Sequence, residues 1–127
     1  MSKSPNRFSN SEIGVVLFGV GAIGSEIARL LLRKKGVKIV GAIDASPEKV
    51  GKDLGDVIGF GRKLNLQILK SINELNVKAD VAIHATTSFL KKAFPQIKAL
   101  VEYGLNVIST CEELSYPYIV DRKLAEQ

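Results

Sequence analysis

The sequence predicts an α/β fold with a doubly wound parallel sheet. Two observations predict it: apolar runs typical of strands buried on both faces, and amphipathic helical patterns that alternate with them. Alternating strands and helices imply right-handed crossovers and a sheet covered on both sides. The 127 residues suffice for one compact domain, and 46% hydrophobic with 24% charged residues is typical of a globular protein.

The first expected elements are two strands with a helix between them. Ile13–Phe18 is an almost unbroken apolar run that ends at Gly19, and Val37–Ile43 is a second strand, closed by Asp44. Gly36 ends the intervening helix. Its expected buried face consists of apolar residues spaced three to four apart, namely Ile23, Ile27, Leu30 and Leu31.

The middle of the chain is rich in turn residues. Ser46–Lys49 reads as an N-cap with proline at the first helical position, which predicts a short helix. Between Gly51 and Gly61, four glycines predict a loop with at most a turn or two of helix. Leu66–Leu69 is a candidate for a short strand.

The second half repeats the strand–helix pattern. A strand is expected at Asp80–Ala85 and another at Leu105–Ile108, with a helix at Phe89–Tyr103 between them. Pro95 is expected to start or bend that helix, and Gly104 to end it. Its expected buried face is Phe94, Ile97, Leu100 and Val101; a turn at Ser115–Pro117 and a helix from Tyr118 to Gln127 complete the series.

Composition excludes several classes of function. The net charge of +5 comes from scattered residues, and the densest run, Arg33–Lys35, complements the negative end of a helix dipole. Without a basic stripe between stacking aromatics, no nucleic-acid partner is expected. Cys111 and His84 are the only residues of their types, so neither a disulfide nor a cysteine or histidine metal site is expected.

Residues 1–12 predict a flexible tail, because they are polar and hold no apolar segment of a signal peptide. No apolar run approaches the roughly 20 residues that cross a membrane. We therefore expect a cytoplasmic protein, with no membrane partner, whose single domain covers residues 13–127.

The first strand leads into a glycine motif, Gly19-Val20-Gly21-Ala22-Ile23-Gly24. Gly-x-Gly-x-x-Gly alone is a weak signal, but here it directly follows a buried strand and opens an amphipathic helix. The three glycines would permit a tight turn, a close approach of the backbone to a pyrophosphate, and close packing of the helix. The helix N-terminus offers N–H groups to the phosphates, so the motif predicts a Rossmann-type dinucleotide site.

Asp44 ends the second strand where a Rossmann domain places the carboxylate that binds the adenosine ribose. The alternative is an ordinary loop aspartate. A carboxylate repels a 2′-phosphate, which favours NAD as the cofactor. NADP use stays open, because downstream cations could approach that phosphate, although solvated surface is the plainer interpretation of Lys49, Lys52, Arg62 and Lys63.

Hydroxyl-rich segments follow the two later strands. Thr86, Thr87 and Ser88 would face the pyrophosphate or the nicotinamide ribose, or cap the next helix. Ser109–Glu113 would lie at the nicotinamide end of the same edge. His84 is expected to be a hydrogen-bonded structural residue and Cys111 a small buried one.

Longer strings carry a resemblance to a known family. Together with the glycine motif, Val40–Asp44, Pro47–Gly55, His84–Phe89 and Cys111–Pro117 resemble 2,4-diaminopentanoate dehydrogenases, within the group that has dihydrodipicolinate-reductase-like N-terminal domains. The resemblance covers nearly everything from Ile13 onward. It implies NAD(P)-dependent oxidative deamination of 2,4-diaminopentanoate, an amino-acid-like substrate, to 2-amino-4-oxopentanoate and ammonia.

The resemblance supplies no catalytic residue. Members of the family carry a second, substrate-binding and oligomerising domain beyond the length of this chain, so we expect a cofactor domain without its substrate domain, and a homo-oligomer stays open. Two alternative functions stay open: a non-catalytic module that senses NAD(H), and a related reductase that acts on another substrate.

Overall fold

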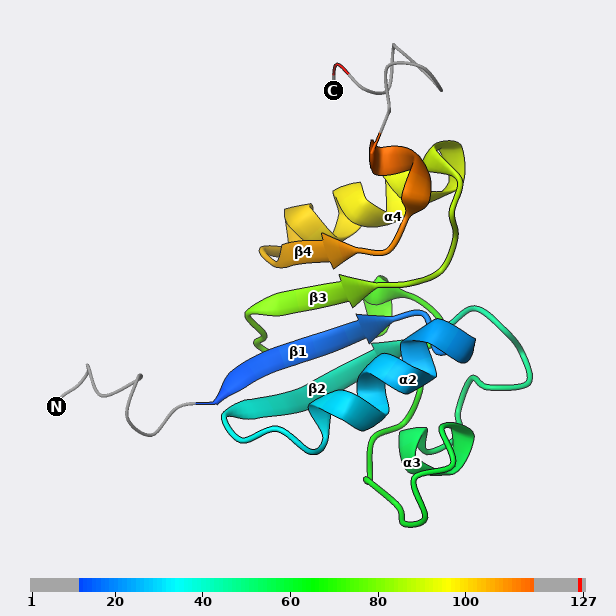
Figure 1. Ribbon diagram of the computed structural model, residues 1–127, viewed down its shortest axis with the longest axis vertical. Helices are drawn as coiled ribbons and strands as arrows, with labels where there is room; N and C mark the ends of the chain where they lie inside the picture. Colours follow the sequence, from blue (N-terminus) through cyan, green and yellow to red (C-terminus); the bar gives the residue numbers. More distant parts are fainter. Residues whose placement is uncertain (1–11, 116–125, 127) are drawn as a thin grey trace, which may run out of the picture.

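The computed structural model describes residues 12–115 and 126. Four parallel strands form one sheet in the order β2-β1-β3-β4 (Figure 1). The expected N-terminal tail and C-terminal helix, and most of the turn before that helix, lie outside the described residues. The strands are β1 (Ile13–Phe18), β2 (Val37–Ile43), β3 (Val81–His84) and β4 (Asn106–Ser109).

Two helices pack on opposite faces of this sheet. Helix α2 (Ala22–Leu31) connects β1 with β2, and α4 (Leu90–Tyr103) connects β3 with β4 (Figure 1). The shorter elements are α3 (Leu54–Val57) and two 3₁₀ turns, η1 (Ile72–Glu74) and η2 (Glu112–Ser115). The doubly wound α/β architecture predicted from the sequence is therefore confirmed.

Successive residues of β1 supply the two apolar cores. Leu17 packs with α2 and the α3 segment, whereas Val16 packs with α4 on the other face. This is the pattern of a strand buried on both sides, as expected from an apolar run without alternation. The first core comprises Val15, Leu17, Val20, Ala28, Ile39, Ala42, Leu54, Ile58 and Ile68, and the second comprises Val16, Ile43, Leu75, Ala82, Leu100 and Leu105.

The buried faces of both long helices agree only in part with the expected ones: Leu100 is buried and Leu31 packs against a core as expected, but other members differ. Ile23 and Leu30 are 59% and 60% exposed, whereas Gly24 and Ala28 are buried in α2. In α4, Val101 is 57% exposed, and Leu90, Ala93 and Leu100 are buried. In both helices small residues lie against the sheet, because they let the helix backbone approach closely, and an apolar count alone does not detect this.

Three local predictions also need correction. Residues 47–50 form a turn rather than a helix, with the Ser46 N–H bound to Asp44. Leu66–Leu69 contributes isolated bridges to Ile43 and Asp53 instead of a strand. Helix α4 begins at Leu90 and runs through Pro95, so Pro95 does not start it. Gly104 ends α4 in the left-handed conformation, and this end was predicted.

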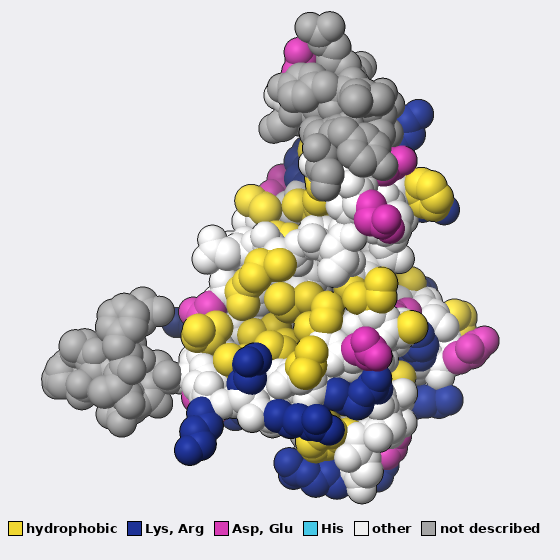
Figure 2. All heavy atoms as spheres, viewed as in Figure 1, with side chains coloured by type: hydrophobic (Ala, Val, Ile, Leu, Met, Phe, Trp, Pro, Cys, Tyr) yellow, Lys and Arg dark blue, Asp and Glu magenta, His cyan; other side chains and the backbone are white. Residues whose placement is uncertain are grey.

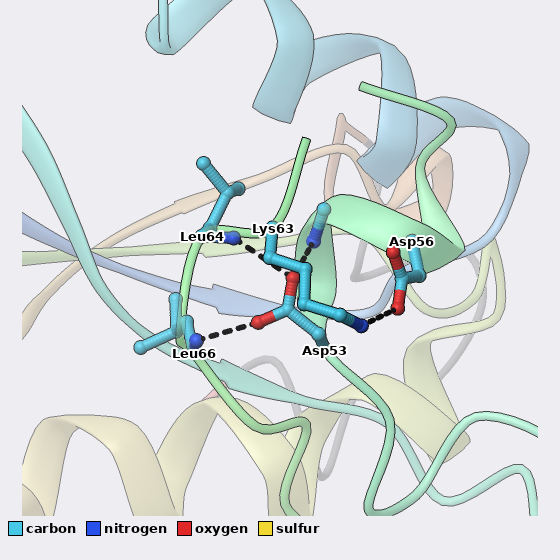
Figure 3. Close-up of polar contacts among 6 residues, drawn as sticks. Asp53, Asp56, Lys63, Leu64 and Leu66 are labelled. Atoms are coloured by element: carbon cyan, nitrogen blue, oxygen red, sulfur yellow. Dashed lines mark hydrogen bonds and ion pairs between the residues drawn. The ribbon is translucent and has the colours of Figure 1, made fainter. Parts of the chain in front are cut away.

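The carboxylate of Asp53 organises the glycine-rich segment around α3 (Figure 3). Oδ2 accepts hydrogen bonds from the N–H groups of Gly55 and Leu64, both at 2.9 Å, and Oδ1 accepts one from Leu66 at 2.9 Å. These backbone hydrogen bonds, that of Leu64 foremost, lower the pKa of Asp53. Asp53 therefore closes a loop that has little regular structure of its own.

Part of the sheet carries exposed apolar side chains on the α2 side. Leu17, Ile83 and Ile108 are neighbours in register across β1, β3 and β4, so they share this face. Ile108 is 60% exposed. Figure 2 shows apolar side chains gathered on this face, with Lys and Arg side chains beside them.

Candidate cofactor site

The carboxyl ends of the four strands bring the predicted site residues to one edge of the sheet. β1 runs into the glycine motif, and β2 ends at Asp44. β3 leads to Thr86–Ser88, and β4 leads to Thr110 and Glu112. In parallel α/β sheets this edge, beside the point where the connections reverse direction, is where ligands bind.

Two adjoining cavities lie along this edge. One, of about 310 Å³, contains Asp44, and the other, of about 400 Å³, contains Thr110 and Glu112. They share Gly21, Ala85 and Thr86, so the glycine motif lies where they meet. The first is lined by Phe18, Gly19, Gly21, Asp44, Ala45, Lys49, Ala85, Thr86 and Gln96, and the second by Gly21–Ile23, Ala85–Phe89, Thr110 and Glu112.

The three glycines of the motif have distinct surroundings. Gly19 has φ of +114°, and a Cβ there would lie 2.5 Å from the carbonyl oxygen of Ala85. A Cβ on Gly24 would fall on the carbonyl oxygen of Gly19, so this glycine lets α2 pack against the loop. A Cβ on Gly21 would meet nothing within 4 Å. A side chain at Gly21 would thus enter the open space between the cavities, where the close approach of a pyrophosphate is expected.

The N-terminus of α2 faces the same space. Gly21 is its N-cap residue and provides no side-chain hydrogen bond to the first turn. The first N–H groups of a helix lack intrahelical partners, and the helix dipole adds partial positive charge there. The arrangement therefore suits an anionic group.

Asp44 links the glycine loop to the turn after β2. Its Oδ2 accepts the Val20 N–H at 2.8 Å, and its Oδ1 accepts the Ser46 N–H at 2.9 Å. Lys49 Nζ lies 3.8 Å from Oδ2. Each carboxylate oxygen still has a lone pair for a ribose hydroxyl, so the carboxylate can hold the loop and bind a sugar together.

The four downstream cations have different surroundings. Lys49 lines the cavity beside Asp44. Lys63 forms an ion pair with Asp56 at 2.5 Å, Arg62 lies over the ring of Phe60, and Lys52 is exposed. Surface roles suit the last three, whereas Lys49 lies beside Asp44 in the cavity.

Hydrogen bonds join the loops that follow β3 and β4. Ser88 Oγ donates to Glu112 Oε1 at 2.6 Å, and Leu90 N–H donates to Glu113 Oε1 at 2.7 Å. Thr87 Oγ1 accepts the Phe89 N–H at 3.1 Å, but Phe89 is the N-cap residue of α4 and this helix has no side-chain cap hydrogen bond, so the capping role considered for this segment is not formed. Thr86 lines both cavities, so it is the hydroxyl residue best placed to meet a bound dinucleotide.

His84 is fully buried at the end of β3. Its Nδ1 lies 2.8 Å from Ser109 Oγ, and its Nε2 lies 2.7 Å from Gln96 Oε1 and 3.1 Å from Thr86 Oγ1. Burial lowers the pKa of His84, although the hydrogen bond to Gln96 opposes this. The ring is therefore a hydrogen-bonded structural histidine, as expected; Cys111 is buried as well.

Gln96 lines the Asp44 cavity, and the sequence reasoning did not identify it. A signal was present: Gln96 lies three residues after Ala93 and four before Leu100, the buried stripe of α4. A polar residue on such a stripe requires a hydrogen-bonding partner. The face expected to be buried shared Leu100 with this stripe, but its other members were apolar residues, so Gln96 was not included.

Neither a membrane-spanning helix nor a metal-binding cluster is found in the part of the chain that the structure describes. No helix among the described residues is long and apolar enough to cross a membrane. Within the same residues, no three histidine, cysteine, aspartate or glutamate side chains are grouped so that they could hold a metal ion.

The fold and the glycine-motif site define an NAD(P)-binding domain of the Rossmann type. A family model described as the N-terminus of dihydrodipicolinate reductase matches residues 13–111, and the chain belongs to that family. The resemblance and the cofactor class inferred from the sequence are thus confirmed.

Known proteins are similar over most of the chain. The 2,4-diaminopentanoate dehydrogenase of Acetoanaerobium sticklandii is 35% identical over 119 residues, which is 91% of this chain and 33% of that protein. The 4-hydroxy-tetrahydrodipicolinate reductase of Dictyoglomus turgidum is 34% identical over 76% of this chain and 34% of its own length. The solved amine dehydrogenase from Mycobacterium smegmatis has a TM-score of 0.81 and 39% identity, over 92% of this chain and 35% of that one. The chain spans about a third of the length of these relatives.

Proposed function

We propose that this chain is the cofactor-binding part of an NAD(P)-dependent oxidoreductase that deaminates a small amino-acid-like amine. The observation that carries the proposal is the pair of adjoining cavities that meet at Gly21, with Asp44 in one and Thr110 in the other. A dinucleotide has the matching order of parts, with a pyrophosphate between two ribosides. The similarity to a diaminopentanoate dehydrogenase and an amine dehydrogenase supports the choice of reaction.

Each predicted site residue has a role in this proposal. The backbone of Gly19–Gly24, including Val20, Ala22 and Ile23, would hold the pyrophosphate, and Asp44 would accept hydrogen bonds from the adenosine ribose. Thr86, Thr87 and Ser88 would flank the pyrophosphate and the nicotinamide riboside. The nicotinamide supplies hydride transfer when it is bound. No side chain of this chain is assigned to proton transfer.

The proposal extends to the partners of the chain. An amine substrate would lie beside the nicotinamide end of the cleft, where Glu112 offers a carboxylate. We also propose that copies of the chain associate through the apolar face at Ile83 and Ile108, because large exposed apolar patches commonly mark interaction sites. Sedimentation of the purified chain would measure it. A cytoplasmic location also remains a proposal.

Substitution of Gly21 by valine tests the cofactor site. A branched side chain would enter the open space where the pyrophosphate is expected, so NADH affinity should fall by at least about tenfold, equivalent to about 1.4 kcal/mol. The backbone angles of Gly21, φ −86° and ψ −156°, are in the extended region, so the fold should persist. Calorimetry with NADH measures the affinity, and thermal unfolding checks the fold.

Gly36→Ala provides a matched control. Gly36 also has open space around a Cβ, but it lies in the turn between α2 and β2, away from the cavities. Its positive φ makes some loss of stability expected, with no loss of NADH affinity. Undiminished affinity in Gly21→Val would show that the dinucleotide does not bind here.

A further inference from the structure

The polar network around buried His84 connects three segments at the cofactor edge. His84 ends β3, Ser109 ends β4, and Gln96 belongs to α4. Thr86, in the loop after β3, donates a hydrogen bond to Gln96 Oε1 at 2.5 Å. Two members of the network, Thr86 and Gln96, line the cavity that contains Asp44. The directions of these hydrogen bonds therefore decide which atoms remain for a ligand.

The directions follow from the amide oxygen of Gln96. Oε1 has no hydrogen to donate, so His84 Nε2, 2.7 Å away, carries the ring hydrogen and donates it. A neutral imidazole with its hydrogen at Nε2 accepts at Nδ1. Ser109 Oγ therefore donates to Nδ1, and it can still accept the Cys111 N–H at 3.0 Å. Burial lowers the pKa of His84, which keeps the ring in this neutral form.

The hydrogen bonds from His84 and Thr86 orient the side-chain amide of Gln96. Its Oε1 accepts hydrogen bonds from both His84 and Thr86, which uses both lone pairs of that oxygen. The amide nitrogen, Nε2, lies on the other branch of the planar group, and none of the described residues accepts a hydrogen bond from it. Gln96 lines the cavity that it shares with Asp44 and Lys49, and its two amide N–H donors remain available to a ligand.

We propose that Gln96 is a cofactor-contacting residue whose side-chain N–H groups donate to an acceptor atom in the adenosine half of the dinucleotide. His84 and Thr86 are the positioning residues that hold the amide in this orientation. The adenosine half is indicated because Asp44 lies in the same cavity. Adenine nitrogens and phosphate oxygens are the acceptors that this half offers. The inference rests on the proposed function, since it assumes that the cleft binds a dinucleotide.

Two substitutions of Gln96 test the contact. Gln96→Glu keeps an oxygen that can accept from His84 and Thr86 but replaces the N–H donors with an acceptor. Gln96→Met removes the donors without adding charge. Both should weaken NADH binding by at least about tenfold, the scale of one hydrogen bond to a charged or well-aligned acceptor. Gln67→Glu, which adds the same charge at an exposed site, should leave NADH affinity unchanged.

The affinities of the Gln96 variants for adenosine and for ADP show which part of the dinucleotide accepts the hydrogen bond from Gln96. Weaker adenosine binding in both Gln96 variants would place the contact on adenine, and weaker ADP binding alone would place it on a phosphate; either result supports the proposal. Wild-type affinity in Gln96→Met, with loss in Gln96→Glu only, would indicate charge repulsion without a contact and would overturn it. Absence of NADH binding by the wild-type chain would instead refute the proposed function.

The orientation of the network has its own test. The chain contains a single histidine, so the ¹⁵N spectrum of the labelled protein reports the tautomer of His84 without ambiguity. We expect hydrogen on Nε2, both with and without NADH. Hydrogen on Nδ1 would make Nε2 an acceptor, turn the amide of Gln96 around and overturn the inference. This measurement does not depend on cofactor binding.

Discussion

At the scale of single residues, Asp44 and Lys49 are expected to set the cofactor preference. Asp44 by itself predicts a preference for NAD, but Lys49 Nζ lies 3.8 Å from its Oδ2, and Lys49 lines the same cavity. A carboxylate repels a 2′-phosphate, whereas an ammonium group attracts it. The two side chains therefore act in opposite directions on the choice between NAD and NADP.

Substitutions of Lys49 and Asp44 should shift the ratio of NADPH to NADH affinity in opposite directions. Lys49→Met should weaken NADPH binding by about tenfold more than NADH binding, and Asp44→Asn should change the ratio in the other direction, because each charged contact contributes about 1–3 kcal/mol. Fluorescence titrations with both cofactors measure the ratio, and Lys52→Met is the control, because Lys52 is exposed and lines neither cavity. An equal loss for both cofactors in Lys49→Met would contradict this role.

At the scale of elements, Asp53 is expected to control the stability of the α3 segment. Because its pKa is lowered in the folded protein, the charged form stabilises the fold above the ordinary value of 3.8. That contribution is lost as the pH falls below 3.8 toward the lower folded pKa. Asp53→Asn should therefore lower Tm near neutral pH and reduce the dependence of Tm on pH in acid.

Hydrogen exchange localises the effect of Asp53. The amides of Gly55, Leu64 and Leu66 should exchange faster in Asp53→Asn, because each donates to the carboxylate. Asp56→Asn is the matched control, since that carboxylate pairs with exposed Lys63 and accepts none of these amides. Unchanged protection of the three amides would show that the loop is held by other contacts.

The sequence predicted the elements well where the physics is local. Apolar runs located all four strands, and Gly104 located the end of α4, because strand burial and a left-handed C-cap leave short-range patterns. The inward face of α2 was not predictable in this way. Gly24 and Ala28 lie inward because the helix approaches the sheet closely, and Ile23 and Leu30 turn outward.

The candidate site was likewise predictable only where its residues form local sequence patterns. The glycine motif and Asp44 are local patterns at strand ends, so their positions followed from the sequence. Gln96 was not found, because its role depends on which side of α4 meets His84 from another strand. The bridge from Leu69 to Ile43 likewise depends on chain segments far apart in sequence.

At the scale of the whole molecule, the 127-residue chain alone should bind NADH but not oxidise 2,4-diaminopentanoate. Hydride transfer needs the substrate carbon held about 3–3.5 Å from the nicotinamide. The cavity at that end is lined by Thr86–Phe89, Thr110 and Glu112, among other residues. None of these side chains is assigned to proton transfer. A spectrophotometric assay of NADH formation measures turnover, with the diaminopentanoate dehydrogenase of A. sticklandii as the positive control. Comparable turnover by this chain would show that it holds a complete active site.

The central position of β1 has a consequence for how the chain folds. β1 precedes the other three strands of the sheet in sequence, yet it pairs with β2 on one side and β3 on the other. Gly14 is bound to Asp80, 66 positions later. Such contacts between distant parts of the sequence slow folding, because a long loop must close before the contacts can form. During translation, the glycine loop is therefore made before β3, with which β1 must pair, and it can form its contacts with the β3 end only after β3 has left the ribosome.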